Sequence, residues 1–539
     1  MKKIVIKGIS FKKRSQRDLS KPYVKNSHMF ALGLGDLGYS LVSCTVATYI
    51  APFATMALNA QATLIGIALA IGVIVDAISD PIVGYWSDNF KNKIFGKRHL
   101  FMLIGLVGML ATSIFIWNIP YEYIWGKFGK DSNTTQVVMF VWFAVGVTVL
   151  RTFNTLYYTP VGAFSVEVSN DYDERTTIQA VRSVFYIIGM ILPVIIMGTF
   201  QNKYAYLNEA GELVKGQFIA QGYKEFAWVA FFICIVTSAF LMIMTFSDIK
   251  VVQARQDAEN NAEKPRPSLK KVITDFFSVL KDGNMRSIIF GYAISMISAT
   301  LIIALGFHVF TFTFVMSTSQ MYILMGALLG MTILGQPLWP LLAKKFDKRK
   351  SMLIGLSISL MGCIALFICW AFNDNINELI AKSGWGIVTL MPALMFAGLG
   401  TGVLYSMPLA LIGDVIVKKK HDGNGEQTGT YAGMMTFAYK ISQSITQLVA
   451  NSLLATIGFV SGQTFQTKET SDNLGLILVV GVTVSVLIGI IIYATLKIDK
   501  KEITQIMEGC RIAPIINVNP ELVAETMACE EKEETKEEE

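Results

Sequence analysis

Twelve long apolar runs limit how this chain can fold. Each is near or above the roughly 20 residues that an α-helix needs to cross the hydrocarbon core of a bilayer. The runs lie near positions 29–53, 62–87, 99–119, 136–158, 179–200, 226–247, 287–316, 321–343, 351–371, 386–411, 430–456 and 474–496. Only 16% of the residues are charged, whereas soluble proteins carry about 25%. We therefore expect an all-α membrane protein with twelve transmembrane helices, which excludes a water-soluble enzyme and an outer-membrane barrel.

Basic residues are distributed unevenly between the predicted loops. Lys and Arg in short loops mark the cytoplasmic side of a membrane protein. If the N-terminus lies inside, the inside segments hold 36 Lys and Arg and the outside loops hold 7. The first 28 residues lack the cleavage pattern of a signal peptide. We expect a multi-pass protein of the cell inner (plasma) membrane with both termini in the cytoplasm.

The longest predicted inside connection divides the twelve runs into six and six. The expected divisions are a cytoplasmic N-terminal segment 1–28, a six-helix bundle 29–247, a cytoplasmic linker 248–286, a second six-helix bundle 287–497 and a cytoplasmic acidic tail 498–539. The linker is polar and contains two prolines, and the tail ends in an almost wholly charged run. These compositions are typical of solvated segments between or beyond folded units.

The two halves carry an internal repeat. The pentapeptide MLIGL occurs at 102–106 and again at 352–356, each time at the start of an apolar run that follows a basic loop. Upstream, an Asp-Pro pair at 80–81 corresponds to a Gln-Pro pair at 336–337. Both offsets are near half the chain length. Two related six-helix halves are typical of secondary transporters, in which rocking of the halves opens a shared site to either side.

Six charged residues lie inside the predicted spans, where insertion scales assign each a cost of about 2.5–3.5 kcal/mol. They are the acids Asp36, Asp76 and Asp80 and the bases Arg151, Arg182 and Lys440. At about 1.5 Å of rise per residue, all six fall between the cytoplasmic interface and the midplane. We expect them to meet in one wet pocket between the halves. Buried structural ion pairs are the alternative, but a structural pair needs only one of two neighbouring acids.

The acids of the second predicted span are suited to bind a cation. Asp76 and Asp80 are four residues apart and share one helix face. Two ionised carboxylates on one face repel, which raises their affinity for a proton or a small cation. Asp36 and Ser40 share a face of the first span in the same way, although Asp36 could also cap or pair locally. We expect no cofactor and no metal other than a coupling ion, H+ or Na+.

Aromatic residues near these charges suit a sugar, because sugar rings stack on aromatic rings while their hydroxyls need polar partners. The candidates are Tyr157, Tyr158, Trp142 and Tyr405. Contact with lipid or with the protein core is the alternative for each of them. His308 also lies in a predicted span, where it is either a satisfied polar group or a proton relay.

Three groups of residues resemble the glycoside–pentoside–hexuronide:cation symporters of the major facilitator superfamily. They are the run DAISDPIVG at 76–84 with GKR at 96–98, the set Glu167, Asp171, ERT at 174–176 and Arg182, and the set Gly413-Asp414, Gly429 and Lys440. The resemblance covers spans 1 to 11, and its span-2 motif is specific. It implies the major facilitator fold and uptake of a sugar or glycoside together with a cation.

The resemblance also implies roles for individual residues. Asp76 and Asp80 match the acids with which that family binds the coupling cation. Arg182 matches its span-5 arginine, Lys440 its span-11 lysine and Tyr405 its span-10 aromatic residue. We therefore expect the first two residues to bind the cation and the other three to contact the substrate.

Four positions are of special interest in the same comparison. The family's span-1 cation acid falls on Ser40, with Asp36 one turn away as a substitute. Its span-4 sugar-binding acid falls on Tyr158. Arg151 is an additional base, and a guanidinium binds a carboxylate in a bidentate manner. Arg151 therefore either binds an acidic sugar such as a uronide, or pairs with Asp36 or Asp76 and compensates the changed acids.

Taken together, the sequence predicts a symporter that takes up a sugar or glycoside with a proton or sodium by alternating access. Its expected partners are that small molecule, the cation and the lipid bilayer, and no nucleic acid. The alternative is a carrier of the same fold for an amphiphilic anion such as a lysolipid, with Arg151 at the head group. A membrane-bound enzyme or sensor is disfavoured, because the inside segments lack a globular pattern and the chain lacks a catalytic motif.

Overall fold

A computed structural model gives the fold of this chain. The structure describes residues 5–6, 9–10, 24–249, 274, 278–421, 428–497, 503 and 506, except positions 91, 93, 97, 170, 171, 210, 212 and 384. Most of the expected N-terminal segment, linker and acidic tail therefore lies outside the described residues.

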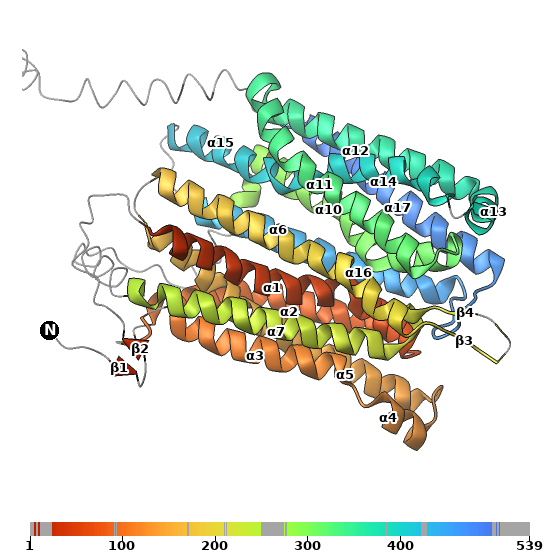
Figure 1. Ribbon diagram of the computed structural model, residues 1–539. Coiled ribbons are helices and arrows are strands. Elements are labelled where there is room, and N and C mark those ends of the chain that lie inside the picture. The colour runs from red at the N-terminus through yellow and green to blue at the C-terminus, as the bar shows by residue number, and fades with distance from the viewer. Residues whose placement is uncertain are drawn as a thin grey trace, which may run out of the picture.

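The described chain is almost entirely helical (Figure 1). The first group of helices is α1 (Asn26–Pro52), η1 (Phe53–Ala57), α2 (Ala62–Asn89), α3 (His99–Trp117), α4 (Tyr121–Phe128), α5 (Asn133–Glu167), α6 (Tyr172–Lys203), η2 (Gly216–Phe218), α7 (Ala220–Thr245) and η3 (Phe246–Asp248). The second group is η4 (Val279–Lys281), α10 (Gly283–His308), η5 (Val309–Thr313), α11 (Thr318–Phe346), α12 (Lys348–Ala371), α13 (Asn373–Ser383), α14 (Ile387–Thr401), η6 (Gly402–Tyr405), α15 (Met407–His421), α16 (Thr428–Thr456) and α17 (Lys468–Ala494).

Two short antiparallel hairpins complete the described elements. They are β1 (Val5–Ile6) with β2 (Ile9–Ser10), and β3 (Tyr206–Leu207) with β4 (Leu213–Val214). Val5 pairs with Ser10 in the first, and Tyr206 pairs with Val214 in the second. The β3–β4 hairpin connects α6 to α7 and marks one end of the molecule, which we call the hairpin end (Figure 1).

Eleven helices within the described residues are long and apolar enough to cross a membrane. They coincide with eleven of the twelve expected runs. The remaining run, 430–456, also forms a helix, α16, but this helix is not among the eleven. It carries Lys440, Gln447 and Asn451, so part of its surface is polar.

Local sequence signals explain where several of these helices begin. The Ser132 side chain accepts a hydrogen bond from the backbone N–H of Thr135 at the start of α5. At the start of α17, the Thr467 side chain accepts one from the backbone N–H of Thr470. Ser317 forms a capping box at the start of α11. Side-chain oxygens at these positions satisfy backbone N–H groups that have no partner within the helix.

The internal repeat has a structural cause in helix packing. Met102 and Met352 are both fully buried. A Cβ at Gly105 would lie 2.4 Å from the Tyr157 nitrogen of α5, and a Cβ at Gly355 would lie 2.7 Å from the Val403 Cβ of η6. Both copies of MLIGL therefore need a glycine where the third long helix of each half packs closely on the next one.

The two halves lie side by side, and their long helices run in roughly the same direction (Figure 1). Their main contacts are between α2 and α16 and between α6 and α11. At the first contact, Ser444 donates a hydrogen bond of 2.9 Å to the carbonyl of Ala70. A Cβ at Gly66 would lie 2.6 Å from the Cβ of Asn451, so the two helices approach closely here. This close approach brings Lys440 of α16 over the acidic face of α2.

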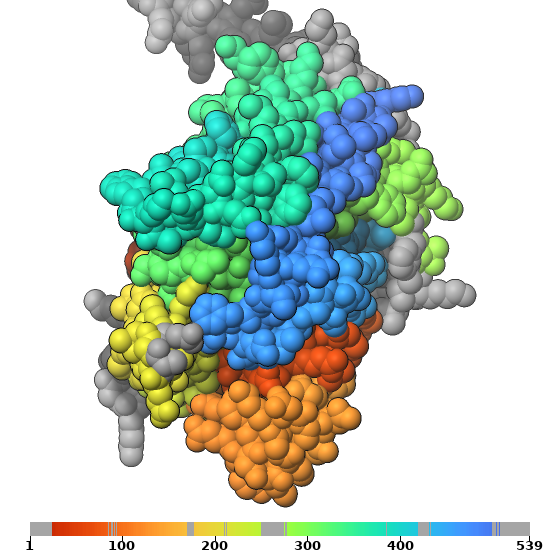
Figure 2. Space-filling view, turned by 90° about the vertical axis from the view of Figure 1, so that its right-hand side faces the viewer, coloured from red at the N-terminus to blue at the C-terminus, as the bar shows by residue number. Residues whose placement is uncertain are grey.

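The halves are also joined at the hairpin end, which Figure 2 shows end-on. Gln217 is buried there; its amide donates to Thr311 at 2.7 Å and accepts from Thr318 at 2.8 Å. The Thr55 hydroxyl lies 2.9 Å from Nε2 of His308, while Nδ1 of His308 is buried and has no hydrogen-bond partner among the described residues. The hairpin end is therefore closed by hydrogen bonds between the halves.

Candidate functional site

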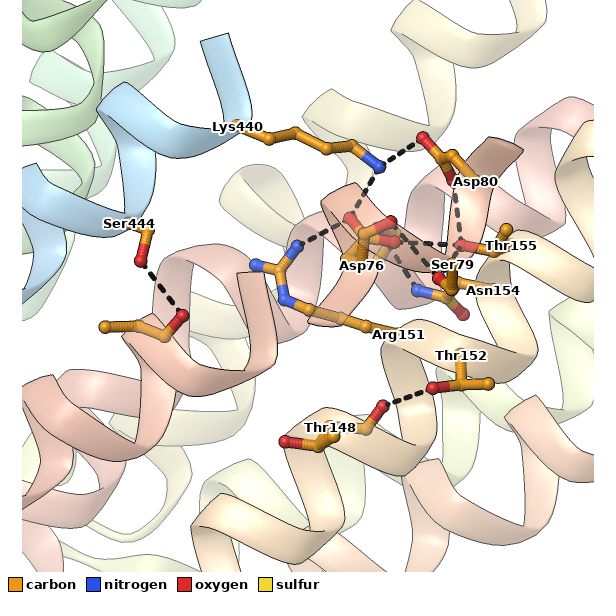
Figure 3. Close-up of polar contacts among 12 residues, drawn as sticks. Asp76, Ser79, Asp80, Thr148, Arg151, Thr152, Asn154, Thr155, Lys440 and Ser444 are labelled. Carbon is orange, nitrogen blue, oxygen red and sulfur yellow. Dashed lines mark hydrogen bonds and ion pairs between the residues drawn. The ribbon is translucent and has the colours of Figure 1, made fainter. Parts of the chain in front are cut away.

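A cluster of charged side chains lies between α2, α5 and α16 (Figure 3). Lys440 Nζ is 2.8 Å from Asp76 Oδ2 and 2.6 Å from Asp80 Oδ2. Arg151 Nη1 approaches the same Asp76 oxygen at 3.4 Å. We call Asp76, Asp80, Arg151, Thr155 and Lys440 the acid–lysine cluster. It unites residues of both halves, since Lys440 is 360 positions from Asp80.

Helix geometry explains why these side chains meet. Asp76 and Asp80 are one turn apart on α2, and Arg151 and Thr155 are one turn apart on α5, so each pair shares a face. The Thr155 hydroxyl lies 2.9 Å from Asp76 Oδ1 and 3.0 Å from Asp80 Oδ1. One hydroxyl carries one hydrogen and cannot donate to two carboxylates at once. If either carboxyl were protonated, it could donate to the Thr155 oxygen while the Thr155 hydroxyl donates to the other carboxylate. The cluster can therefore accept one proton without losing either hydrogen bond.

A second group surrounds Arg182 on α6. Its Nε lies 2.7 Å from Asp36 Oδ2 and its Nη2 lies 3.1 Å from Asp36 Oδ1, which is a bidentate ion pair. Nη1 donates to Ser165 at 2.6 Å and to Gln179 at 3.2 Å. The guanidinium carbon lies 5.8 Å from the centre of the Tyr158 ring.

This second group borders a cavity of about 240 Å3 between α6 and α11. The lining residues are Asp36, Tyr158, Gln179, Arg182, Ser183, Tyr186, Ile187, Met190, Thr332, Ile333, Gln336 and Tyr405. We call it the arginine cavity. It combines a paired ion, amide and hydroxyl groups and aromatic rings, which is the composition of a small-molecule site.

Tyr405 reaches the arginine cavity because the tenth expected span is broken. The α-helix ends at Thr401, a short 3-10 turn follows at 402–405, and α15 begins at Met407. Pro408 lacks an N–H group and its ring excludes a continuous helix through the preceding turn. The expected run 386–411 is therefore two helices with an aromatic residue at the joint.

The six intramembrane charges thus form two groups and not the single pocket that we expected. Asp36 pairs with Arg182 and is not among the contacts of the acid–lysine cluster. A tyrosine stack lies between the groups: the ring centres of Tyr39 and Tyr158 are 4.2 Å apart. Aromatic packing of this kind was not evident from the sequence, because Tyr39 carries no motif.

The remaining predicted residues are placed as follows. Ser40 is fully buried, donates to the carbonyl of Leu37 at 3.1 Å and packs against Gly189 of α6, so it joins neither group. Tyr157 is fully buried and donates to Ser238 at 3.0 Å. Trp142 stacks on Phe115 at 3.9 Å. Thr155 is a member of the cluster that the sequence motifs did not indicate, although its spacing of four from Arg151 places both on one helix face.

Comparison with known proteins defines the family. The profile of the MFS/sugar transport protein family matches residues 31–500. The chain belongs to this family. Relatives and structural neighbours of this family member are membrane transporters, so it is a transporter and not an enzyme.

Individual relatives of this family member differ in what they carry. It is 19% identical to the sodium-dependent lysophosphatidylcholine symporter 1 of Gallus gallus, over 87% of this chain and 86% of that protein. It is 20% identical to the isoprimeverose transporter of Lactiplantibacillus pentosus, over 82% and 83%. An uncharacterized symporter of Synechocystis is 33% identical, but that match covers only 31% of this chain and 29% of that protein.

Solved structures confirm the major facilitator fold. A bacterial homologue of the iron transporter ferroportin superposes with a TM-score of 0.59 at 12% identity, covering 88% of this chain and 99% of that one. A D-xylose–proton symporter superposes with a TM-score of 0.53 at 13% identity, covering 84% and 96%. At these identities the likeness concerns the fold alone.

Proposed function

We propose that this transporter is a secondary active symporter that takes up a sugar or glycoside together with a proton or a sodium ion. The observation that carries the proposal is the position of Lys440, whose ammonium lies between the carboxylates of Asp76 and Asp80 and comes from the opposite half. A coupling cation at these oxygens would compete with a bond that ties the halves together. Cation binding is thereby linked to movement of the halves. Within this family, the span-2 motif at 76–84 also resembles the melibiose permease.

The arginine cavity is the proposed sugar site. Arg182 and Asp36 present donors and acceptors for hydroxyl groups, and Tyr158 and Tyr405 present aromatic rings for the apolar faces of a sugar. Its volume of about 240 Å3 lies just below the usual range for ligand pockets of about 300–1,000 Å3. A small glycoside fits this scale better than a bulky ligand does.

Alternating access follows from the charges. A carboxylate that is left unpaired cannot easily enter a closing, dry interface. Empty carrier, with Lys440 between the acids, and fully loaded carrier, with the cation there, both avoid this state. A carrier in which Lys440 leaves the acids before the cation binds does not avoid it, so separation of the halves at this ion pair requires the cation.

Neutralising the acids tests the proposal directly. Asp76→Asn and Asp80→Asn should each abolish gradient-driven accumulation in membrane vesicles, because the cation loses a charged ligand. Both variants should still exchange bound sugar across the membrane without a gradient. Wild-type accumulation by both variants would show that the proposed cation site is wrong. A matched control is Asp374→Asn, at an exposed ion pair with Lys468, which should accumulate normally.

A carrier of amphiphilic anions is the second candidate function. Ile187, Met190 and Ile333 give the arginine cavity an apolar side between α6 and α11, where an acyl chain could lie. Curated relatives include lysophosphatidylcholine symporters. Competition of uptake by lysolipids, with no competition by a panel of neutral and acidic glycosides, would favour this function over sugar transport.

The membrane orientation is part of the proposal. We propose that the protein lies in the cell inner (plasma) membrane with both termini in the cytoplasm, because Lys and Arg are concentrated in the predicted inside segments. The arginine cavity then lies toward the cytoplasm and the hairpin end toward the outside. We also propose that residues 29–247 and 287–497 form the two six-helix bundles.

A further inference from the structure

One face of α16 carries a line of polar side chains along its contact with α2. Its members, which we call the polar line, follow one another at spacings of four, three and four residues and are Lys440, Ser444, Gln447 and Asn451. Such spacings place residues on one face of an α-helix. Lys440 contacts the acids of α2, Ser444 donates to a carbonyl of α2, and Asn451 packs against a glycine of α2. Figure 3 shows the first two of these contacts.

The polar line extends from the acid–lysine cluster toward the hairpin end. The loop after α16 reaches η1, where the N–H of Gly462 donates to the carbonyl of Thr55 at 2.9 Å. Asn451 lies eleven residues after Lys440, which at about 1.5 Å of rise per residue is about 16 Å. Asn451 is therefore much closer to the closed end of the molecule than the acids of α2 are.

Two side-chain oxygens of the polar line have no hydrogen-bond partner among the described residues. They are Oε1 of Gln447 and Oδ1 of Asn451, and the two residues are 4% and 0% exposed. The amide nitrogen of Asn451 donates to the backbone carbonyl of Gln447 at 2.8 Å, so the orientation of this amide leaves its oxygen free. A buried polar group without a partner is destabilising, and an apolar side chain of the same size would avoid this effect. Two such oxygens on one helix face therefore indicate a ligand that they bind in another state of the carrier.

The face of α16 that meets α10 differs in this respect. Ser442 donates to the carbonyl of Ala293 on α10 at 2.8 Å, and Thr446 donates to the carbonyl of Ser442 within α16 at 2.8 Å. Among the described side chains of α16, buried oxygens without a partner lie only in the polar line. They are thus restricted to the face that leads to Asp76 and Asp80.

We propose that Gln447 and Asn451 form an outer site at which a coupling sodium ion binds before it reaches Asp76 and Asp80. This inference rests on the proposed function, since it assumes cation-coupled uptake with the hairpin end outside. Amide oxygens are ligands of hard metal cations, and two that lie one helix turn apart can contact one ion. An amide does not take up a proton in the range in which carboxyl groups titrate. The outer site is therefore specific for a metal cation.

Opening of the hairpin end would expose the outer site before the acids. The part of α2 that covers it contains Gly66, where a Cβ would lie 2.6 Å from the Cβ of Asn451. Separation there admits water to both amide oxygens while Lys440 still lies between the carboxylates. A sodium ion at Gln447 is then about 10 Å from Lys440 along the helix, and the two positive charges repel. This repulsion favours release of Lys440 from the acids and its replacement by the ion.

Uptake at graded external sodium into right-side-out membrane vesicles tests the inference. The substrate is whichever of phenyl β-glucoside, phenyl β-glucuronide and lysophosphatidylcholine the wild type accumulates. Gln447→Met and Asn451→Leu each remove one oxygen at nearly constant side-chain size. Each variant should lower the initial slope of uptake against external sodium about fivefold or more, because contacts of charged groups are among the stronger polar interactions. The rate at saturating sodium should stay near that of wild type.

Two controls separate this effect from a loss of folded protein. In inside-out vesicles, sodium is supplied to the cytoplasmic face, so the same variants should keep the wild-type dependence on sodium. Thr446→Val, on the face of α16 toward α10, should behave as wild type in both kinds of vesicle. Since the slope and the saturating rate are measured in one sample, their ratio does not depend on the folded yield.

The outcomes separate the inference from the proposed function. An unchanged slope in both variants, an equal change in both kinds of vesicle, or uptake that is driven by protons and indifferent to sodium overturns the inference and leaves cation-coupled transport intact. A low rate of both variants at saturating sodium also overturns it, because the oxygens would then serve the fold or the cation site at the acids. Accumulation of no substrate under a gradient of either ion overturns the proposed function and the inference with it.

Discussion

In the proposed function, Lys440 occupies the place that the coupling cation takes on loading. Its ammonium contacts one oxygen of Asp76 and one of Asp80, and the three side chains are mostly buried. Breaking a buried ion pair by removing one partner typically costs about 3–5 kcal/mol, because the other partner is left unpaired. Here the loss would leave two neighbouring carboxylates that repel each other.

The first prediction concerns the stability of Lys440→Gln. The variant should unfold at a lower temperature than wild type in detergent near neutral pH without sodium. Lowering the pH or adding sodium should recover much of the loss, because either ion neutralises a carboxylate. Thermal unfolding across a grid of pH and sodium concentration measures both effects.

A double variant provides the control for this prediction. Asp80→Asn with Lys440→Gln removes one charge of each sign, so its unfolding temperature should return toward wild type and depend little on sodium. If Lys440→Gln loses the same stability at every pH and sodium concentration, Lys440 supports the fold by packing and not by replacing a cation.

Among the helical elements, α1 and α10 end in the same unusual way. Each continues into a five-residue π-helix, η1 and η5, at the hairpin end. Single turns of π-helix are rare and often lie at functional sites. Thr55 of η1 bonds His308, and Thr311 of η5 accepts from Gln217. The two matching ends therefore supply the side chains that close this end of the molecule.

Gln217 is the point at which this closure is most easily tested. Gln217→Leu removes the acceptor of the buried Thr318 hydroxyl and the amide that donates to Thr311, and an unsatisfied buried polar group costs about 1–3 kcal/mol. The closed hairpin end should lose population, and the arginine cavity at the other end should close in exchange. In a background without native cysteines, labelling of Ser183→Cys, on an exposed part of the cavity lining, should slow about fivefold or more.

Asn202→Ala is the matched control at the same end. Asn202 donates to Ser319 at 2.9 Å across the halves, but this hydrogen bond is exposed, so its loss should change labelling little. Equal slowing in both variants would indicate a general loosening of the hairpin end. An unchanged rate in Gln217→Leu would show that the buried amide does not hold the halves together.

The sequence predicted the helices, but it did not predict which side chains of different helices contact one another. Apolar length predicted the spans, and the MLIGL repeat predicted matching halves, because both depend on local properties of the chain. Spacing of four also placed Asp76 and Asp80 on one face. It could not reveal that Asp36 pairs with Arg182 while the Tyr39–Tyr158 stack lies between the groups, since rotation of α1 depends on packing against several helices.

At the scale of the whole molecule, the cavity and the closure lie at opposite ends. The arginine cavity is lined by the first half of α6, from Gln179 to Met190, and by Asp36 near the start of α1. Contacts at the hairpin end involve η1, the last residues of α6 and η2, which precedes α7. The structure is thus closed at the hairpin end, while the arginine cavity lies toward the other end.

The last prediction is that closure of the hairpin end depends on pH through Lys215. It lies outside the membrane-spanning helices, beside a cavity of about 250 Å3, and donates to the carbonyl of Met316 at 2.7 Å. Burial lowers the pKa of Lys215 from 10.5 to about 8. If opening exposes this side chain and restores its ordinary pKa, the closed form binds fewer protons between these two values. Raising the pH from about 8 toward 10 should therefore favour the closed form, whereas the pH should have no such effect well below 8.

Spin labels on Glu209, in the hairpin loop, and Lys382, on α13, report on this prediction through the distance between the halves. The population at the short distance should increase between pH 7.5 and pH 9.5. Lys215→Met cannot titrate and avoids burying a charge, so it should show a high closed population at both pH values. A pH response that persists in Lys215→Met would assign the effect to another group. If Lys215→Met loses the response and also has a low closed population, the hydrogen bond to Met316 stabilises the closed form by more than burial of the charge destabilises it.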